Sequence, residues 1–320
     1  MGPVFGQASG LERVGPAWRA GVLGVAMLSA MILGAGFGTR LRPLTDVLPK
    51  PMLPVGDRAA VLHIVGQLRD AGVTTLALNT HHRAEAFGGV IAAGVQLVHE
   101  EGQLLGTAGG VAHARHVLGE GAVIVWNGDV LSEPDVAGLM RPHEEVATVD
   151  PVATLLAVDR RAGEGTLGVG REGNVVRLRG QVFGEEVRGA DFLGIQVLTE
   201  RGRTLLPTQG CLVGDVYLPA LHRGDRVQVA WHPGEWDDIG SPHALINANL
   251  RWLRRHELER WIAPSARVHA GAIVEHTVVS QGAVVHAGAV VRECLLLEGA
   301  EVRGDVVRAI VMQDGRVVPA

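Results

Sequence analysis

MILGAGFGTRLRPLTDVLPKPMLPVG, residues 31–56, is the stretch around which the rest of this 320-residue chain is arranged. Its apolar start, residues 31–33, predicts a short buried strand. Glycines follow at once, and there the backbone can turn sharply and approach a ligand without Cβ atoms in the way. Arg40 comes next, and Lys50 stands between two prolines that stiffen its surroundings. Free backbone N–H groups beside two fixed cations predict a polyphosphate site.

Two well-known glycine-loop motifs do not match the sequence of residues 31–56. A dinucleotide-binding Gly-x-Gly-x-x-Gly loop would need glycine where Thr39 stands. A Walker A loop would need Gly-Lys-Ser or Gly-Lys-Thr, which this stretch lacks. The predicted polyphosphate site is therefore neither a dinucleotide-binding loop nor a Walker A loop.

Downstream of the loop, helical and strand patterns alternate. Helices are expected at 58–71, 83–93 and 242–256, and a loop at 102–110 opens a further helix that runs to about residue 118. Strands are expected at 73–78, 95–99, 123–126, 153–158, 175–178 and 192–197. Such alternation predicts an α/β fold whose mostly parallel sheet has helices on both faces. Ligands of such sheets bind at the carboxyl ends of the strands, where the polar loops fall.

Composition narrows the function. The net charge of −5 gives no basic field for nucleic acid. Cys211 and Cys294 lie far apart and suggest neither a disulfide framework nor a metal site, which favours a cytoplasmic protein. Residues 20–38 carry no charge, but their second half is the strand of the glycine loop, so we do not expect a membrane span. We expect residues 1–26 to be an extension or a misassigned start, with Met27 the natural beginning.

The pattern Gly-x-Gly-Thr-Arg-Leu-x-Pro-Leu-Thr, followed by Pro-Lys-Pro, resembles the signature of the sugar-1-phosphate nucleotidyltransferases. The resemblance covers most of the chain. It implies a Rossmann-like sheet and transfer of a nucleotidyl group from a nucleoside triphosphate to a sugar 1-phosphate. It also implies Arg40 and Lys50 as catalytic residues. Arg40 would stabilise the departing pyrophosphate, and Lys50 would bridge phosphates of the two substrates.

The same resemblance assigns a magnesium site and the substrate contacts. Asp129 matches a Gly-Asp metal ligand, and Asp238 matches the acid of Trp-x-Asp-x-Gly-Ser/Thr-Pro, with the adjacent Asp237 as its competitor. Carboxylates, phosphates and water are the ligands that Mg²⁺ prefers. The substrate-binding residues expected from the family are Leu33, Gly34, Ala35, Gly36, Gly38, Thr39, Asn79, Gly106, Thr107, Gly109, Asn127 and Gly194.

One departure concerns the sugar. Family members often carry Glu-Lys-Pro after a central hairpin, with a lysine that meets the sugar phosphate, but this chain has no lysine there. Arg177 or Arg179 can take that role, since strand alternation would put both on one face. A solvated strand edge is the alternative.

From residue 262 the residue pattern changes. Small residues stand beside single aliphatic ones, Gly-Ala pairs recur, and an aliphatic residue returns about every six positions. This resembles the left-handed parallel β-helix of hexapeptide-repeat proteins, with about three coils at the 18 residues per coil of that family. An ordinary antiparallel β-domain is the alternative. The expected domains are 27–257 for nucleotidyl transfer and 262–320 for the repeats.

Within the family, the Leu-Gly-Thr-Ala-Gly loop and the trailing repeats most resemble mannose-1-phosphate guanylyltransferases, which implies GTP and mannose 1-phosphate. Transferases that use UTP or dTTP share the same framework, so either nucleotide is an alternative to GTP. A non-catalytic regulatory subunit and a bifunctional enzyme with an acyltransferase in the repeats are further alternatives. We expect the repeats to pack against the catalytic domain or against a second copy in a homo-oligomer.

Overall fold

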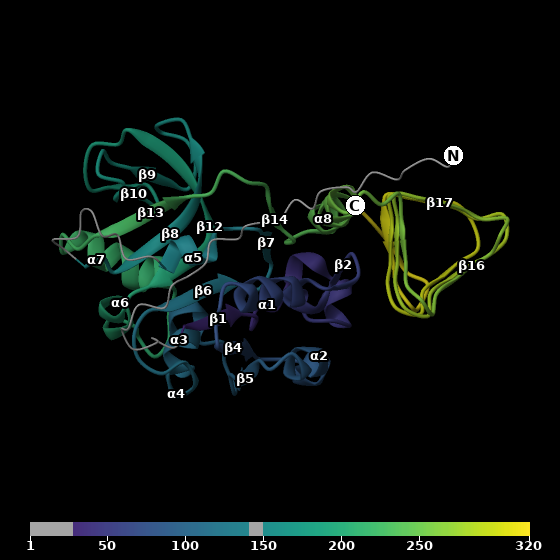
Figure 1. Ribbon diagram of the computed structural model, residues 1–320, viewed down its shortest axis with the longest axis horizontal. Helices are drawn as coiled ribbons and strands as arrows, with labels where there is room; N and C mark the ends of the chain where they lie inside the picture. The colour runs from purple at the N-terminus through teal and green to yellow at the C-terminus, as the bar shows by residue number, and fades with distance from the viewer. Residues whose placement is uncertain (1–27, 141–149) are drawn as a thin grey trace, which may run out of the picture.

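The computed structural model describes residues 28–140 and 150–320. The expected extension at 1–26 and the start expected at Met27 lie outside the described residues. Figure 1 shows an α/β body and a three-sided coil, with helix α8 (Pro242–Arg255) between them.

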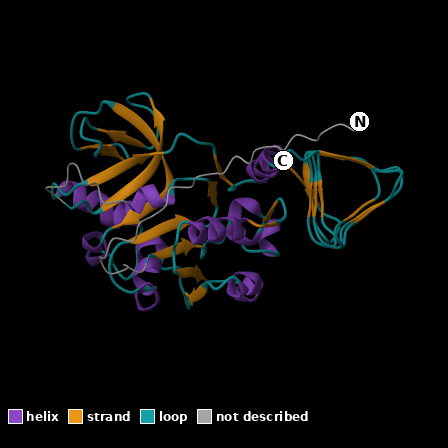
Figure 2. Cartoon of the chain, in the orientation of Figure 1, coloured by secondary structure: helices purple, strands orange, loops and turns teal. Residues whose placement is uncertain are grey.

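A mixed ten-stranded sheet forms the centre of the α/β body (Figure 2). Eight strands follow the order β11-β10-β9-β12-β6-β1-β4-β5, and β8 and β13 join through β12. The strands are β1 (Ser29–Leu33), β4 (Thr75–Thr80), β5 (Gln96–His99), β6 (Val123–Asn127), β8 (Ala153–Arg160), β9 (Leu167–Val169), β10 (Val175–Leu178), β11 (Gln181–Val182), β12 (Arg188–Leu198) and β13 (Val227–Trp231). The strands β6, β1, β4 and β5 pair in parallel, as expected, whereas β12 is antiparallel to β6, β8 and β9.

Helices cover both faces of the parallel part. Ala30 and Ile32 of β1 pack in one core with α1, while Met31 packs in a second core with α3 and α4. Alternate residues of one strand therefore enter opposite cores, which explains the continuous apolar run. The helices are α1 (Ala60–Asp70), α2 (Gly88–Ala92), α3 (Gly106–His113), α4 (Arg115–Leu118), α5 (Val136–Met140), α6 (Glu200–Thr204), α7 (Leu218–His222) and α8. Single turns are η1 (Thr39–Leu41), η2 (Leu44–Asp46), η3 (Lys50–Met52), η4 (Ala84–Phe87) and the π-helical η5 (Leu212–Tyr217).

Two helix boundaries differ from the prediction. The helix expected from residue 58 begins at Ala60, because β3 (Arg58–Ala59) pairs with β2 (Pro54–Val55) in a short hairpin. The helix expected to run to about residue 118 breaks at Ala114 into α3 and α4. Local periodicity of the sequence predicts neither boundary. The start of α1 depends on the pairing of β3 with β2, and the break between α3 and α4 involves a single residue.

A separate two-stranded ribbon carries the chain across the edge of the sheet. β7 (Val130–Ser132) pairs antiparallel with β14 (Trp236–Asp238), so that Val130 lies opposite Asp238. α8 follows this ribbon, and the Ser241 hydroxyl accepts a hydrogen bond of 3.2 Å from Ala244 N at its start. This cap fixes where the helix begins.

The carboxyl-terminal part is a short parallel β-helix (Figure 1). Its first stack contains β15 (Trp261–Ile262), β18 (Val278–Val279), β21 (Leu295–Leu296) and β24 (Ala309–Val311), followed by the antiparallel β25 (Val317–Pro319). The second contains β16 (Arg267–Val268), β19 (Val284–Val285) and β22 (Glu301–Val302), and the third β17 (Ile273–Glu275), β20 (Val290–Arg292) and β23 (Val306–Val307). These parallel stacks exclude the antiparallel alternative.

The first two coils are each one residue shorter than expected, and the last is shorter still, since Leu295 pairs with Ile310, 15 residues later. Trp261 pairs with Val278 and Val278 with Leu295, a step of 17 residues in place of 18. One corner of successive coils is a single residue with positive φ, at His276 (47°) and Glu293 (50°). Such a corner turns the chain within one residue and keeps the coil short.

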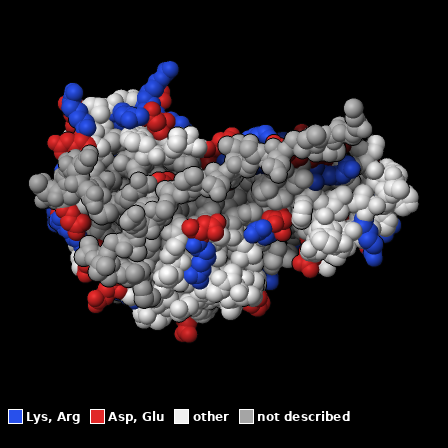
Figure 3. Space-filling view, viewed as in Figure 1, with Lys and Arg blue, Asp and Glu red and all other residues white. Residues whose placement is uncertain are grey.

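The described surface carries both signs of charge. On the face seen in Figure 3, Lys and Arg side chains lie beside Asp and Glu, without a broad field of either sign among the coloured residues. Within the described ranges, no helix is both long and apolar enough to cross a bilayer.

Candidate active site

The glycine loop leaves the buried end of β1 and folds over it. Gly38 has φ 61°, and a Cβ atom there would lie 2.7 Å from Cγ2 of Thr45. The Thr45 hydroxyl donates a 2.9 Å hydrogen bond to Gly38 O and closes the loop. A Cβ atom at Gly36, by contrast, would have no neighbour within 4 Å. Gly38 therefore serves the shape of the loop, while Gly36 leaves its outer face open.

A cavity of about 260 Å³ lies over this loop. It is lined by parts of residues 33–41, by Lys50 and Pro51, by Asp129 and by Gly240. Most of the sequence-predicted loop residues thus meet at one cavity with three predicted charged residues, Arg40, Lys50 and Asp129, at the carboxyl end of β1.

Lys50 lies between the two predicted metal ligands. Its Nζ donates to a carboxylate oxygen of Asp129 and lies 3.3 Å from Oδ1 of Asp238. The Lys50 side chain is 11% exposed, whereas Asp129 and Asp238 are 30% and 46% exposed. Both acids are therefore more exposed than the ammonium, and of the two acids only Asp129 lines the cavity.

Backbone pairing explains why residues so distant in sequence meet. Asp129 lies in the turn between β6 and β7, and Asp238 ends β14. Ile239 N donates a 3.0 Å hydrogen bond to Asp129 O, which fixes the two turns side by side. Asp237, the competitor of Asp238, points to the other face and pairs with Arg251 at 3.1 Å. Burial raises the pKa of Asp237, although Arg251 acts to lower it.

Arg40 reaches the same place from the loop. A Cβ atom at Gly240 would lie 2.9 Å from Nη2 of Arg40 and 3.0 Å from Oδ1 of Asp238. Glycine at 240 therefore leaves room for both side chains. Arg40 is exposed, and within the described part of the chain its guanidinium has no hydrogen-bond or ion-pair partner.

Asn79 serves as a structural link. It is 3% exposed, and its Oδ1 accepts a 2.8 Å hydrogen bond from Gly34 N. Its Nδ2 donates to Oε1 of the buried Glu100 at 2.6 Å, and Glu100 Oε2 accepts from Leu105 N at 2.9 Å. This chain of hydrogen bonds ties the glycine loop to the loop before α3. The sequence prediction missed Glu100, although it follows β5 at the same sheet edge.

The predicted substrate-binding residues at the start of α3 pack against residues 208–212, a segment that the sequence did not single out. Gly106 has φ 74°, and a Cβ atom there would lie 2.4 Å from Gly210 O. A Cβ atom at Gly109 would lie 2.7 Å from Thr208 O. The Thr107 hydroxyl accepts a 2.8 Å hydrogen bond from Leu212 N. Close packing inside the protein thus requires small residues here.

Asn127 and Gly194 touch across β6 and β12. β12 shifts register between Phe192 and Gln196, and Gly194 in this bend has φ 76°. A Cβ atom at Gly194 would lie 2.3 Å from Nδ2 of Asn127. The bend and the missing side chain therefore make room for the Asn127 amide, which is half-buried.

The two candidate arginines have different surroundings, and they do not share a strand face. Arg177 makes two hydrogen bonds to Glu186, at 2.7 and 3.1 Å, and others to carbonyls of residues 164, 165 and 167. Arg179 follows the end of β10 with φ 48°, and its Nη2 contacts Cys211 Sγ at 3.4 Å. The left-handed residue ends the alternation on which the prediction depended.

Cys211 lies beside Arg179, and two histidines lie beside Phe37 of the glycine loop. Burial acts to raise the pKa of Cys211, but N–H groups of Gly214 and Val213 outweigh it, and the pKa is lowered. On the other flank, Phe37 of the glycine loop stacks on His82 with ring centroids 5.8 Å apart. Burial lowers the pKa of His82, and the adjacent His81 acts in the same direction.

The donor set fits a hard divalent cation that also binds substrate. Two carboxylates converge here on one positive group, the Lys50 ammonium. Across residues 28–140 and 150–320, no three His, Cys, Asp or Glu side chains gather as a metal centre. An ion held by Asp129 and Asp238 would therefore complete its shell with phosphate oxygens and water, which is how Mg²⁺ is commonly bound.

Comparison with known proteins agrees with this geometry. The family model described as "Nucleotidyl transferase" matches residues 29–179. A mannose-1-phosphate guanylyltransferase of Mycobacterium tuberculosis is 28% identical over 279 residues, which cover 80% of this chain and 76% of that protein. An N-acetylmuramate alpha-1-phosphate uridylyltransferase of Caulobacter vibrioides is 40% identical over 110 residues, 31% of this chain and 45% of that protein.

Among solved structures, HddC from Yersinia pseudotuberculosis superposes with a TM-score of 0.57 at 21% identity. The match covers 71% of this chain and all of that one, and it shows that the two share a fold. Residues 29–179 therefore match the nucleotidyl transferase family, and over most of its length the chain is similar to sugar-1-phosphate nucleotidyltransferases.

Proposed function

We propose that the protein joins a sugar 1-phosphate to a nucleoside triphosphate, giving a nucleoside diphosphate sugar and pyrophosphate, at the cavity over the glycine loop. The observation that carries this proposal is the meeting of Lys50 with Asp129 and Asp238 at the edge of that cavity. A phosphate loop alone would bind a polyphosphate. A loop joined to a cation and two exposed carboxylates can also hold a second phosphate and a metal ion.

In the reaction, a phosphate oxygen of the sugar 1-phosphate attacks the α-phosphorus of the triphosphate. The new O–P bond forms as the bond from the α-phosphorus to the bridging oxygen of pyrophosphate breaks. Both reactants are anions, so the protein has to neutralise charge and hold the two in line. The open backbone around Gly36 would cradle the triphosphate, and the unpaired guanidinium of Arg40 would meet the departing pyrophosphate.

Lys50 is proposed to change partners during binding. Its ammonium now neutralises Asp129 and Asp238. Once a divalent ion is held by the two acids, the ammonium would be free to contact phosphate oxygens of both substrates. A divalent metal is general in the family, and we propose Mg²⁺, which when bound would neutralise charge that develops on the phosphates.

For the substrates, we propose GTP and mannose 1-phosphate. This proposal is supported by the Mycobacterium tuberculosis relative, a mannose-1-phosphate guanylyltransferase whose match extends over most of both chains. UTP is the alternative nucleotide, because the uridylyltransferase relative also matches this chain, although over a shorter stretch. For the sugar phosphate, Arg179 is the better candidate, because the Arg177 guanidinium is fully used by Glu186 and three carbonyls.

The other substrate contacts stay predictions with different support. The positions of Leu33, Gly34, Gly36, Gly38 and Thr39 around the cavity favour direct contact, whereas Ala35 is buried and does not line it. The buried position of Asn79, with both polar atoms bonded, favours an indirect role. The domains 27–257 and 262–320, a cytoplasmic location and a homo-oligomer formed through the repeats are also proposals.

The test is a panel of reactions with purified protein and Mg²⁺. GTP, UTP, dTTP, CTP and ATP are each combined with several sugar 1-phosphates, and pyrophosphate release is followed. The proposal predicts sugar-phosphate-dependent release, fastest with GTP and mannose 1-phosphate. No release with any pair would favour the non-catalytic regulatory subunit.

A further inference from the structure

Neighbouring carboxylates of β14 lie on opposite faces of the β7–β14 ribbon. Successive side chains of a strand point to opposite faces. Asp238 accordingly faces Lys50 and is 46% exposed, while Asp237 points away and is 12% exposed. A group that fixes Asp237 therefore also fixes the backbone that carries Asp238.

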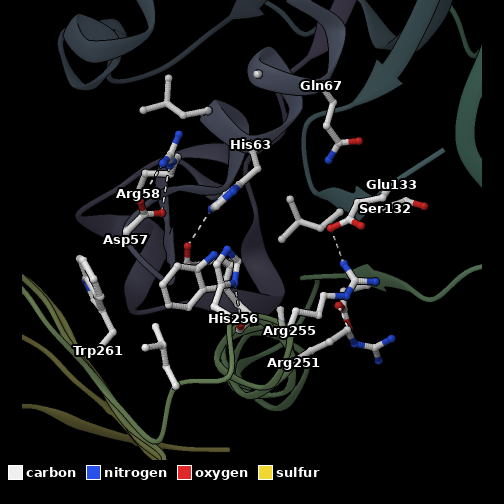
Figure 4. A pocket seen from close by; sticks show the side chains of 18 of the residues that line it. Asp57, Arg58, His63, Gln67, Ser132, Glu133, Arg251, Arg255, His256 and Trp261 are labelled. Carbon is white, nitrogen blue, oxygen red and sulfur yellow. Dashed lines mark hydrogen bonds and ion pairs between the residues drawn. The ribbon is translucent and has the colours of Figure 1, made fainter. Parts of the chain in front are cut away.

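Behind the ribbon lies a second cavity, of about 550 Å³ (Figure 4). Leu131 and Ser132 of β7, Asp237 of β14, and Arg251 and Arg255 of α8 contribute to its wall. Because the space beside the ribbon is open, side-chain packing alone does not hold this part of it. Ion pairs from α8 span the gap.

The arginines of α8 that reach the ribbon are one turn apart. Arg251 Nε lies 3.1 Å from Asp237 Oδ2, and its Nη1 lies 3.3 Å from Glu235. Arg255 lies 2.9 Å from Glu133, just after β7, and 3.8 Å from Glu235. The spacing i, i+4 places both on one helix face, so they hold both strands of the ribbon.

α8 is itself fixed from two other sides. Asn249 Oδ1 accepts a 2.9 Å hydrogen bond from Gly56 N, in the hairpin after Lys50. Leu245 and Ile246 pack in one core with Val278 and Leu295 of the β-helix. The helix therefore has a fixed position from which Arg251 can hold the ribbon.

We propose that Arg251 is a positioning residue for nucleotidyl transfer, which holds Asp238 in place beside Asp129 by clamping Asp237 from behind. The inference rests on the proposed function, since it takes Asp238 as a metal ligand. It also gives the β-helix a role, because the coil supports the helix that carries Arg251.

The test compares Arg251→Met with Arg251→Lys, and with Arg254→Met as the matched control. Arg254 lies on the same helix and pairs only with Glu235 among the described residues, at 3.3 Å and with a 66% exposed side chain. Mn²⁺ binding is measured from the free-ion signal by electron paramagnetic resonance, without substrate. kcat and KM are measured separately with Mg²⁺.

Arg251→Met should weaken Mn²⁺ binding and lower kcat by about tenfold each, the lower end of what loss of a supporting contact costs a metal site. KM for the triphosphate should change less than twofold. Arg251→Lys should recover most of the loss, and Arg254→Met should match wild type. Wild-type Mn²⁺ affinity and kcat in Arg251→Met would overturn the inference.

Asp237→Asn, which keeps size and shape, serves alone if Arg251→Met fails to fold, and wild-type Mn²⁺ affinity in it would then overturn the inference. If Arg251→Met folds, the two changes are also combined. The single variant should weaken Mn²⁺ binding, and the double variant should lose no more than the worse single one, because both remove the same clamp. Additive losses would overturn the inference. If the wild type binds Mn²⁺ but turns over no substrate pair, the proposed function fails, while the Mn²⁺ measurements still decide the clamp.

Discussion

Replacing Lys50 by Met should change two properties of the protein in opposite directions. Met keeps an unbranched apolar stem but removes the ammonium that lies between Asp129 and Asp238. Without that ammonium, a divalent ion meets no competitor for the two carboxylates and should bind the substrate-free protein more tightly. Catalysis should fall, because the positive charge for the two anionic substrates is lost.

The structure sets the size of both effects. Lys50 is 11% exposed, but its partners are 30% and 46% exposed, so water screens the ion pairs. Pairs of this kind are worth about 0.2–1 kcal/mol, which corresponds to Mn²⁺ binding about 1.4–5-fold tighter. Loss of a charged contact in the transition state typically costs about 10²-fold or more in kcat, or about 3 kcal/mol in the barrier.

Mn²⁺ titration and steady-state pyrophosphate release measure the two effects on the same preparation. Arg42→Met is the matched control, since Arg42 is a cation of the same loop that pairs with Asp46 at the surface, 63% exposed. It should leave both quantities within twofold of wild type. Weaker Mn²⁺ binding in Lys50→Met, or a wild-type kcat, would refute the assigned role of Lys50.

Three further predictions concern the surroundings of the cavity. Asn79→Ala leaves two buried polar partners without a hydrogen bond and should lower the free energy of unfolding by about 2–4 kcal/mol in urea titrations, whereas an unchanged value would contradict its structural role. Arg179→Ala should raise KM for the sugar 1-phosphate with little loss of stability, and Arg177→Ala should mainly lower stability, so the reverse pattern would contradict the assignment. Iodoacetamide should label Cys211 before Cys294, and its labelling should persist to lower pH than that of an ordinary thiol, because the pKa of Cys211 is lowered and burial raises that of Cys294; equal labelling by mass spectrometry would contradict this.

The sequence was sufficient to predict the centre of the site because its determinants are local or follow from sheet topology. The glycine loop could be predicted from the sequence of residues 31–56, which includes Lys50. The meeting of Asp129 with Asp238 was predicted from the expectation that each ends an element at the same sheet edge. In the structure Asp129 follows β6 of the sheet, whereas Asp238 ends β14 of the ribbon and lies opposite Val130, the residue after Asp129. The family pattern favoured Asp238 over Asp237, and the structure places Asp238 beside Lys50.

What the sequence did not predict depends on contacts between distant segments. Glu100 gave no signal of burial, because its partners Asn79 and Leu105 N lie on other elements. The use of Arg177 by Glu186 depends on a hairpin register that the pattern of residues does not specify. The left-handed conformation of Arg179 likewise belongs to a turn with no glycine at that position.

The most direct test of the central claim follows the α-phosphate itself. Wild-type protein is incubated with Mg²⁺, GTP labelled at the α-phosphorus and mannose 1-phosphate, beside Asp129→Asn and Asp238→Asn proteins whose thermal unfolding matches wild type. Label should appear in a nucleoside diphosphate sugar with the wild type only, and only when the sugar phosphate is present. Labelled product at wild-type rates from either Asn variant would contradict the assignment of these two acids to the reaction.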